Sequence, residues 1–146
     1  MIYGICSILK NLGANANLRK NILKEEYLRT MNRYLCIWND KNNSGFGTQL
    51  MVQLTACYRH LAVEEKSHKV FLKSNCFDTW TRLIELFPTS NDIVFNLLRI
   101  LSKLSNYESV CQKLNEKKQC IKTLSSFFKF YKTNIHIIIR IAYIFA

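Results

Sequence analysis

Cysteine can act as a nucleophile, a metal ligand or a disulfide partner, and six cysteines are spread along the 146 residues of this chain. They form no Cys-x-x-Cys pair and no short-spaced framework, and most stand among apolar helical positions: Cys6, Cys36, Cys57, Cys76, Cys111 and Cys120. This distribution is typical of reduced, small core residues in an intracellular protein.

Histidines and paired carboxylates are the other candidates for chemistry. His60 and His68 are eight residues apart, which is not the i, i+4 spacing of helical metal ligands. The pairs Glu25–Glu26 and Glu64–Glu65 are typical of helix starts. We find no Gly-x-Ser-x-Gly motif, activated Cys/His context or phosphate-binding glycine loop. We therefore predict no catalytic residue, no metal, no cofactor and no enzyme activity.

Net charge is the strongest compositional signal, with 21 basic against 10 acidic residues and a formal charge of +11. Residues 101–146 alone carry eight basic and two acidic residues. Such a surface attracts acidic peptides, tubulin tails or nucleic acid. The alternative is that a Lys-, Asn- and Ile-rich composition gives every solvated helix face this charge.

Aromatic residues alternate with lysines near the C-terminus, which superficially suggests base stacking. The lysines are Lys122, Lys129 and Lys132, and the aromatic residues are Phe127, Phe128, Phe130 and Tyr131. At helical spacing these rings more simply pack between helices, and no nucleic-acid motif accompanies them.

Neither end of the chain predicts a targeting or membrane segment. Residues 1–13 carry only Lys10 as a basic residue and lack a cleavage site, so we expect no signal peptide. Residues 135–146 are apolar but contain His136 and Arg140 and fall short of the roughly 20 residues that span a bilayer. We expect a core helix ended by the chain end, no membrane contact and a cytoplasmic location.

Apolar periodicity predicts an all-α chain. Residues 91–104 give the clearest helix, because seven apolar residues close one broad stripe there. We place Gly13 in a left-handed C-cap, Asn17 at a helix N-cap and Asn75 in a left-handed conformation, and we read 39–47 as a loop. The other expected helices span 1–12, 18–23, 25–38, 48–63, 66–73, 77–87, 107–114, 118–128 and 135–146.

Three blocks of the sequence align without gaps. They are ILKNLGANANLRKNI (8–22), CYRHLAVEEKSHKVF (57–71) and ILSKLSNYESVCQKL (100–114). Leu12, Leu61 and Leu104 stand in register, at separations of 49 and 43 residues. A period in the low forties with long, short and long helices indicates stacked helical repeats.

The motif LSKLSNYESVCQKL, and the ending IIRIAYIFA, resemble the armadillo repeat family. The resemblance implies a right-handed superhelix of about three stacked three-helix repeats, truncated at both ends, with units 1–47, 48–90, 91–133 and a partial helix 134–146. The family's glycine between the short helix and the next helix is absent, and Glu26, Asn75 and Gln119 stand near its position. The short blocks and the RIAYIFA ending resemble more closely one armadillo family linked to assembly of cilia and sperm flagella, which implies a fragment of a longer array.

In armadillo proteins of the import and adhesion type, one helix of each repeat lines a peptide-binding groove. The positions that match this groove are Asn11, His60 and Lys103, with Ser7, Ala56 and Arg99 one turn earlier. The family's paired Trp and Asn are absent except for Asn11, so binding of basic import peptides is doubtful. A groove with His60, Arg99 and Lys103 favours an acidic peptide.

Two functions of different class follow. The first is a non-catalytic protein-interaction scaffold in cilium or sperm flagellum (axoneme) assembly, whose partners are acidic peptides, axonemal or transport proteins, and the remaining repeats of a longer chain. The alternative is a basic helical-repeat module that binds nucleic acid through phosphates, which predicts a steep loss of affinity with salt.

Overall fold

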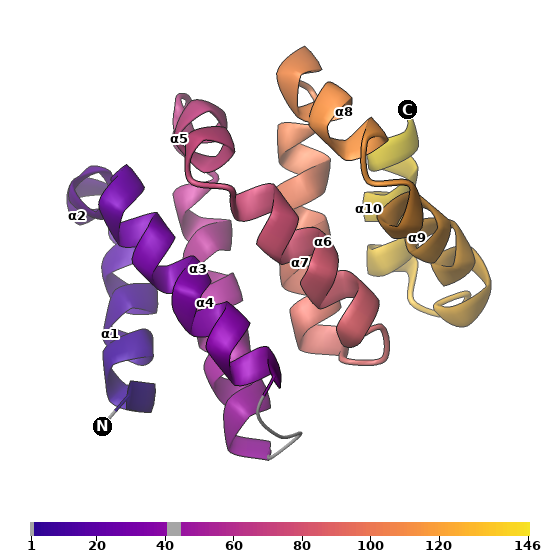
Figure 1. Cartoon of the computed structure of the whole chain (residues 1–146). Coiled ribbons are helices and arrows are strands. Elements are labelled where there is room, and N and C mark those ends of the chain that lie inside the picture. Colours follow the sequence, from indigo (N-terminus) through magenta and orange to yellow (C-terminus); the bar gives the residue numbers. More distant parts are fainter. Residues whose placement is uncertain (1, 41–44) are drawn as a thin grey trace. The chain divides into compact units, whose positions relative to one another are not determined.

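The computed structural model describes residues 2–40 and 45–146. Within these ranges the chain forms ten helices and no strand, which confirms the predicted all-α, armadillo-like class (Figure 1). The helices are α1 (Ile2–Ala14), α2 (Ala16–Ile22), α3 (Glu25–Asp40), α4 (Gly45–Leu61), α5 (Ser67–Lys73), α6 (Cys76–Leu86), α7 (Asn91–Leu104), α8 (Glu108–Asn115), α9 (Lys118–Phe130) and α10 (Ile135–Phe145).

Most predicted helix bounds agree with the structure to within two residues, and α7 spans the predicted 91–104. The predicted loop 39–47 is too long at both margins. α3 continues to Asp40 and α4 already begins at Gly45, while residues 41–44 lie outside the described ranges. The N-cap prediction is wrong by two residues, because the side chain that caps α2 is Asn15, whose Oδ1 accepts from Asn17 N at 2.9 Å.

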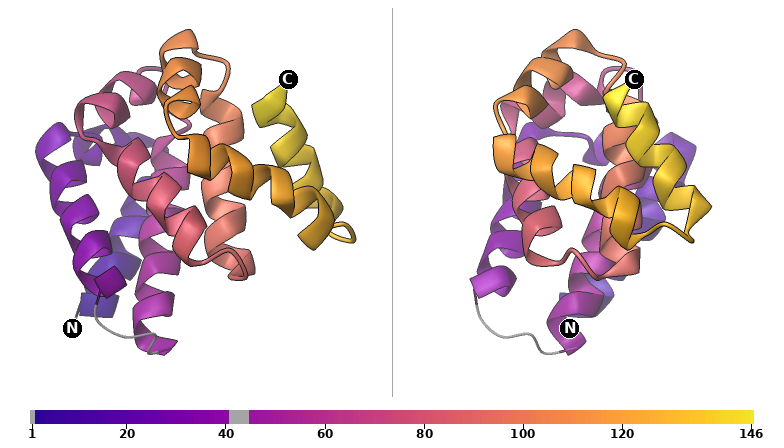
Figure 2. Two further views of the ribbon diagram at one scale, coloured as in Figure 1. Left: turned by 45° about the vertical axis from the view of Figure 1, so that its right-hand side comes forward. Right: turned by 90° about the vertical axis from the view of Figure 1, so that its right-hand side faces the viewer.

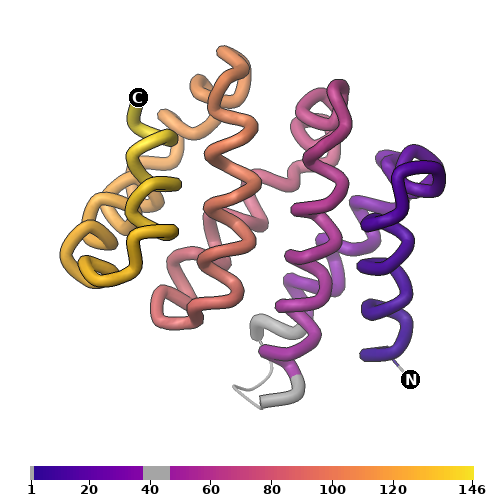
Figure 3. Tube along the Cα trace, turned by 180° about the vertical axis from the view of Figure 1, so that it is seen from behind, coloured from indigo at the N-terminus to yellow at the C-terminus, as the bar shows by residue number. Residues whose placement is uncertain are grey.

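The chain divides into two compact units, and the boundary falls inside α6. Unit 1 comprises Met1–Thr79 and unit 2 comprises Trp80–Ala146. Each unit contains one pair of long helices that hold equivalent positions in successive repeats and pack side by side. These pairs are α1 with α4 in unit 1 and α7 with α10 in unit 2 (Figure 3).

A glycine lies at the contact between α1 and α4 in unit 1. Gly13 lies inside α1 with an ordinary helical φ, so the predicted left-handed C-cap is wrong. A Cβ at Gly13 would lie 3.4 Å from Cys57 Sγ and 3.5 Å from His60 Cβ. Nearby, the Cys57 thiol lies 3.3 Å from Leu9 O. The two distances from the Gly13 Cβ are ordinary van der Waals distances, so the end of α1 packs directly on α4 at Gly13, and a small side chain would also fit there.

A buried polar network holds α3 against α4 and the α5–α6 junction. The Tyr58 hydroxyl donates to Asn32 Oδ1 at 2.7 Å and lies 3.2 Å from Leu28 O. Asn32 Nδ2 in turn donates to Ser74 O at 2.8 Å. Because Tyr58 is fully buried and Asn32 is 7% exposed, these bonds satisfy polar groups that would otherwise be costly inside unit 1.

In unit 2, α10 packs against α7 and α9 (Figure 2). The α10 side chains that face inward are Ile137 and Ile141, both fully buried. The Tyr131 ring packs on Phe127 at 5.2 Å between centroids, and its hydroxyl donates to Pro88 O at 2.7 Å. Two of the four aromatic residues in the Lys-rich stretch are therefore core residues, whereas Phe128 and Phe130 are exposed.

One backbone carbonyl near the end of each of the helices α1, α4 and α7 is bonded by a side chain of the short segment that follows. Arg19 Nε donates to Gly13 O at 2.8 Å, Ser67 Oγ lies 3.5 Å from Ala62 O, and Cys111 Sγ lies 2.8 Å from Ser105 O. The three carbonyls are in register in the aligned blocks. The last carbonyls of a helix lack intrahelical donors, so each repeat meets the same need with a different side chain.

Arg19 makes the most extensive of these caps. Its Nη2 also donates to Ala14 O at 3.2 Å, and its Nη1 lies 3.3 Å from Glu64 Oε1 just beyond α4. Both side chains are largely buried, at 12% and 18% exposed, so this ion pair is less screened than a surface pair. Arg19 thereby ties the ends of α1 and α4 together.

Asn75 has the left-handed conformation predicted for it, with φ of 56°, and it is the only non-glycine residue with positive φ in the described ranges. It stands between α5 and α6, near the position of the family's glycine. Asparagine is the residue that best replaces glycine in this conformation.

Replacement of Asn75 tests this assignment. Asn75→Ala is expected to lower the free energy of unfolding by about 1 kcal/mol, because a left-handed backbone is unfavourable for a residue with Cβ and no local hydrogen bond. Asn75→Gly should leave stability equal or slightly higher, because glycine has no Cβ to clash. Urea unfolding followed by circular dichroism measures both, with Asn115→Ala as a control at an exposed helix end. Equal losses for alanine and glycine would contradict the backbone explanation.

Candidate partner-binding surfaces

The predicted groove positions in unit 1 lie on the adjacent helices α1 and α4. Asn11 is exposed on α1, and Ser7 one turn earlier is half-buried. On α4, His60 is half-buried beside Arg59, whose Nη2 lies 3.5 Å from His60 Nε2, and Ala56 is only 7% exposed. Here the surface offers amide, hydroxyl and imidazole groups for hydrogen bonding, while Ala56 contributes little beyond its small size.

The predicted groove positions in unit 2 are both cations on α7. Arg99 and Lys103 are exposed and stand one helical turn apart. The Arg99 guanidinium lies over the Phe95 ring at 5.6 Å, and that ring is in edge-on contact with His136 of α10 at 6.5 Å. A cation over an aromatic face is held in place without losing its charge.

A surface hollow of about 520 Å³ adjoins Lys103 between α7 and α10. Its lining residues are Ser102, Lys103 and Asn106 from the α7 side and Ile139, Arg140 and Tyr143 from α10. The lining thus includes two cations and no carboxylate. The Ser105 hydroxyl, which lies 3.3 Å from Tyr143 O, links the two helices beside it.

Sequence reasoning missed Arg140, Tyr143 and Asn106 as members of this surface. A signal was available for Tyr143. When IIRIAYIFA is aligned with the other long helices, Tyr143 takes the register position of Arg99, where the family places its groove tryptophan. The structure shows it 61% exposed beside Ile139, which is 43% exposed.

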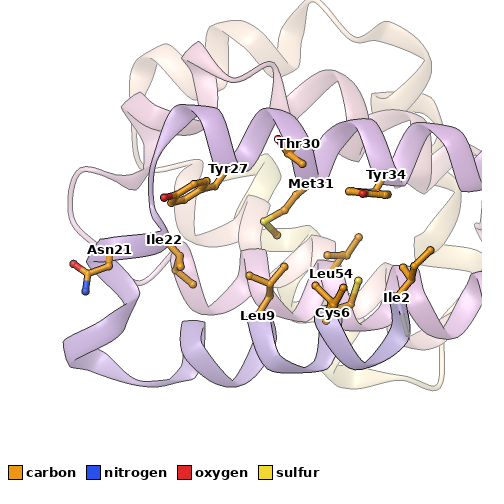
Figure 4. A pocket seen from close by; sticks show the side chains of 11 residues that line it. Ile2, Cys6, Leu9, Asn21, Ile22, Tyr27, Thr30, Met31, Tyr34 and Leu54 are labelled. Atoms are coloured by element: carbon orange, nitrogen blue, oxygen red, sulfur yellow. The ribbon is translucent and has the colours of Figure 1, made fainter.

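An apolar pocket in unit 1 lies between α1 and α3, with Leu54 of α4 behind it (Figure 4). Its volume is about 490 Å³. The α1 side chains are Ile2, Ile5, Cys6 and Leu9; α2 supplies Asn21 and Ile22; α3 supplies Tyr27, Thr30, Met31 and Tyr34. The sequence predicted an apolar stripe on α1 but not that part of it would stay uncovered.

Buried thiols in the chain are poor nucleophiles. Burial raises the pKa of Cys57, Cys76 and Cys120 from 9.0 to about 12 each, and it also raises the pKa of Cys6. The thiolate is the reactive form of cysteine, so these four groups remain inert thiols at neutral pH. Among the described residues, no three or more His, Cys, Asp or Glu side chains come together as a metal site would require.

No described helix has the length and apolar character needed to cross a membrane.

Known proteins with sequence similarity to this chain share one name. The mouse (Mus musculus) armadillo repeat-containing protein 2 is 30% identical over 95 residues, which is 65% of this chain. The human (Homo sapiens) and bovine (Bos taurus) proteins of that name are each 26% identical over 102 residues, or 70% of this chain. The chain is a distant armadillo-repeat relative. No family model and no solved structure matches it.

The armadillo relationship agrees with the fold and with the family seen in the LSKLSNYESVCQKL and RIAYIFA motifs. The aligned region covers only 11% of the length of each relative. Armadillo relatives point to a non-enzymatic helical scaffold that binds protein partners.

The buried thiols predict a loss of stability at alkaline pH. Unfolding exposes them, and the unfolded thiols ionise near pH 9, whereas Cys57, Cys76 and Cys120 stay protonated in the folded chain up to about pH 12. Their contribution to the free energy of unfolding is therefore complete below pH 9 and is lost as the pH rises from 9 toward 12. The loss is about 1 kcal/mol per thiol at about pH 10.

Urea unfolding at about pH 8 and about pH 10 measures this effect. Cys120→Ala should reduce the difference between the two pH values. Val110→Ala, a substitution at another buried site in unit 2, should lower the free energy of unfolding by the same amount at both pH values. An unchanged pH dependence in Cys120→Ala would show that this thiol is not the titrating group.

Proposed function

We propose that the chain is a non-catalytic scaffold that binds acidic segments of partner proteins along its paired long helices. The observation that supports this most directly is the hollow between α7 and α10, which combines Lys103 and Arg140 with the exposed Ile139 and Tyr143. Arg99 extends the cationic surface by one turn along α7.

Each part of the hollow has a role in recognising an acidic peptide. Lys103 and Arg140 are donors for carboxylates, and an arginine can bind a carboxylate with two parallel hydrogen bonds. Ile139 and Tyr143 offer apolar surface to an aliphatic side chain between the acidic residues. Asn106 is exposed beside them and offers an amide to an extended peptide backbone.

In unit 1, the groove positions Ser7, Asn11, Ala56 and His60 are proposed to contact the same kind of peptide by hydrogen bonds rather than by charge. Asn11 is the one position that keeps the family's residue. Ala56 is buried, so the direct contacts in this proposal come mainly from the other three positions.

Charge reversal tests the hollow. Binding of a fluorescein-labelled peptide of Asp and Glu residues around a single Leu is measured by fluorescence anisotropy. The double variant Lys103→Glu/Arg140→Glu should bind about tenfold more weakly or worse, because both attractive charges become repulsive. Lys122→Glu/Lys129→Glu, with the same change of net charge at exposed α9 positions, should bind almost as the wild type does.

Equal weakening in both double variants would show attraction to net charge alone and would contradict a defined site. The salt dependence separates the nucleic-acid alternative. A duplex bound through many phosphates should lose about a thousandfold or more in affinity between about 50 and 200 mM salt. Duplex RNA that binds far more tightly than the peptide, with that salt dependence, would favour the alternative.

The cellular role that we propose is assembly of cilia or sperm flagella, in the cytoplasm and at the cilium. This finer proposal is supported by the resemblance of the short blocks and the RIAYIFA ending to an armadillo family linked to that process. It implies that the acidic segments belong to axonemal or transport proteins.

Depletion of the protein from ciliated cells tests the cellular role. Cilia are expected to be shorter or fewer, and wild-type protein should restore them. The variant with Asn11, His60, Arg99 and Lys103 all changed to Glu should fail to do so, although it is expressed at the same level. Normal cilia after depletion would contradict the ciliary role, and full rescue by the variant would contradict the groove.

A further inference from the structure

Two cations of unit 2 line the hollow between α7 and α10 without an ion-pair partner. Lys103 is exposed on α7, and Arg140 is half-buried on α10. Among the described residues neither side chain forms an ion pair, whereas Lys113 of the same unit is paired with Glu116 at 3.5 Å. The hollow therefore brings together two positive charges that the chain leaves available to a ligand.

The carboxylates that follow in the sequence are few and have other partners. Residues 93–146 contain only Glu108 and Glu116 as acidic side chains. Gln112 Nε2 donates to Glu108 Oε1 at 3.2 Å, and Glu116 is paired with Lys113. Neither carboxylate lines the hollow. Because like charges at one site repel each other, an anionic ligand relieves this repulsion as it binds.

Backbone carbonyls at the end of α7 are already bonded by side-chain donors. The last carbonyls of a helix carry partial negative charge, which opposes an anion, and the hollow adjoins this end of α7. Ser105 Oγ donates to Ser102 O at 3.1 Å. Asn106 Nδ2 donates to Lys103 O at 3.3 Å. These bonds weaken the negative potential of the helix end, so the two cations dominate the electrostatic field of the hollow.

A phosphate monoester matches these charges better than one carboxylate does. A phosphorylated serine or threonine carries a charge of about −1.5 to −2 at neutral pH and three acceptor oxygens, whereas a glutamate carries one charge and two oxygens. One phosphate can accept two parallel hydrogen bonds from the Arg140 guanidinium and a further bond from the Lys103 ammonium. The hollow, at about 520 Å³, has room for such a side chain.

The rest of the lining favours a peptide over a nucleic acid as the carrier of the phosphate. Ile139 and Tyr143 are 43% and 61% exposed and give the hollow an apolar part on the α10 side. A nucleic-acid backbone carries a phosphate at every step and is matched by a row of cations, whereas this lining provides two. A phosphorylated side chain between aliphatic neighbours fits both the charged and the apolar part.

We infer that the hollow recognises a phosphorylated serine or threonine of a partner protein, so that phosphorylation of the partner switches its binding on. The phosphate lies between Lys103 and Arg140, and its aliphatic neighbours in the partner pack on Ile139 and Tyr143. This inference rests on the proposed function and narrows it, because a segment that carries only Asp and Glu residues would then bind weakly.

Three fluorescein-labelled peptides with identical flanking leucines test the ligand. They differ at the centre, which is a phosphoserine, a serine, or two adjacent glutamates with about the total charge of the phosphoserine. Fluorescence anisotropy with the full chain measures each dissociation constant. The phosphopeptide should bind at least about tenfold more tightly than the diglutamate peptide, because one phosphate engages both cations at a single place. The serine peptide should bind more weakly than either.

Neutral variants test the site. Arg140→Gln and Lys103→Gln should each lower the preference for the phosphopeptide over the diglutamate peptide to less than about threefold, because one remaining cation pairs with either anion. Arg140→Lys should keep part of the preference, since it retains the charge but loses the two parallel hydrogen bonds. Lys129→Gln removes the same charge at an exposed α9 position and should keep the full preference. Unchanged thermal melting shows that the variants are folded.

Several results would overturn the inference. Equal binding of the phosphopeptide and the diglutamate peptide to the wild type would do so and would leave the proposed function standing, whereas no binding of either peptide would contradict both. A full preference in Arg140→Gln and in Lys103→Gln would place the phosphate outside the hollow. Duplex RNA that displaces the phosphopeptide, and loses as much affinity as the peptide does in these variants, would make the hollow part of a nucleic-acid surface instead.

Discussion

Contact between long helices of the same repeat register is the constraint on which both units depend. A stripe of apolar residues as broad as that of α7 cannot be covered by a two-turn helix such as α8, so it needs another long helix beside it. In unit 1 this requirement brings the end of α1 onto α4, where Gly13 faces Cys57 and His60. In unit 2 it leaves α10 with Ile137 and Ile141 inward and Arg140 and Tyr143 outward. Burial of Ile137 and Ile141 sets the orientation of α10 and thereby turns Arg140 and Tyr143 toward the solvent, where a partner can reach them.

The ends of the long helices show how such a fold tolerates sequence divergence. Each leaves one carbonyl at the same register, and the chain satisfies it with the Arg19 guanidinium, the Ser67 hydroxyl or the Cys111 thiol. The physical need is a donor at that place, which many residue types meet. Likewise Asn75 takes the left-handed backbone that the family gives to glycine. Replacements of this kind keep the backbone geometry while the amino-acid sequence diverges. This is consistent with a helical repeat architecture at only 26–30% identity to the armadillo relatives.

The helices could be predicted well because burial of one face imposes a 3.6-residue period, as in Asn91–Leu104, and the all-α class followed from it. Helix caps were harder to predict than the helices themselves. The residue types of Gly13 and Asn17 favour caps, but Gly13 lies inside α1 against α4, and Asn15 rather than Asn17 caps α2. Only the three-dimensional structure shows this. The candidate sites were the least predictable. Lys103 came from the family register, but its partner Arg140 depends on α10 lying against α7. The pocket between α1 and α3 is a surface that nothing in the described structure covers, and periodicity alone cannot reveal that.

The hollow in unit 2 and the apolar pocket in unit 1 differ in the physical forces that their lining residues can offer. The hollow at Lys103 and Arg140 attracts its partner through exposed charges, whose interaction falls as salt screens them. The pocket at Ile5 and Leu54 is lined by apolar side chains, and burial of apolar surface is insensitive to salt at moderate concentration and is strengthened by salts that are excluded from protein surfaces.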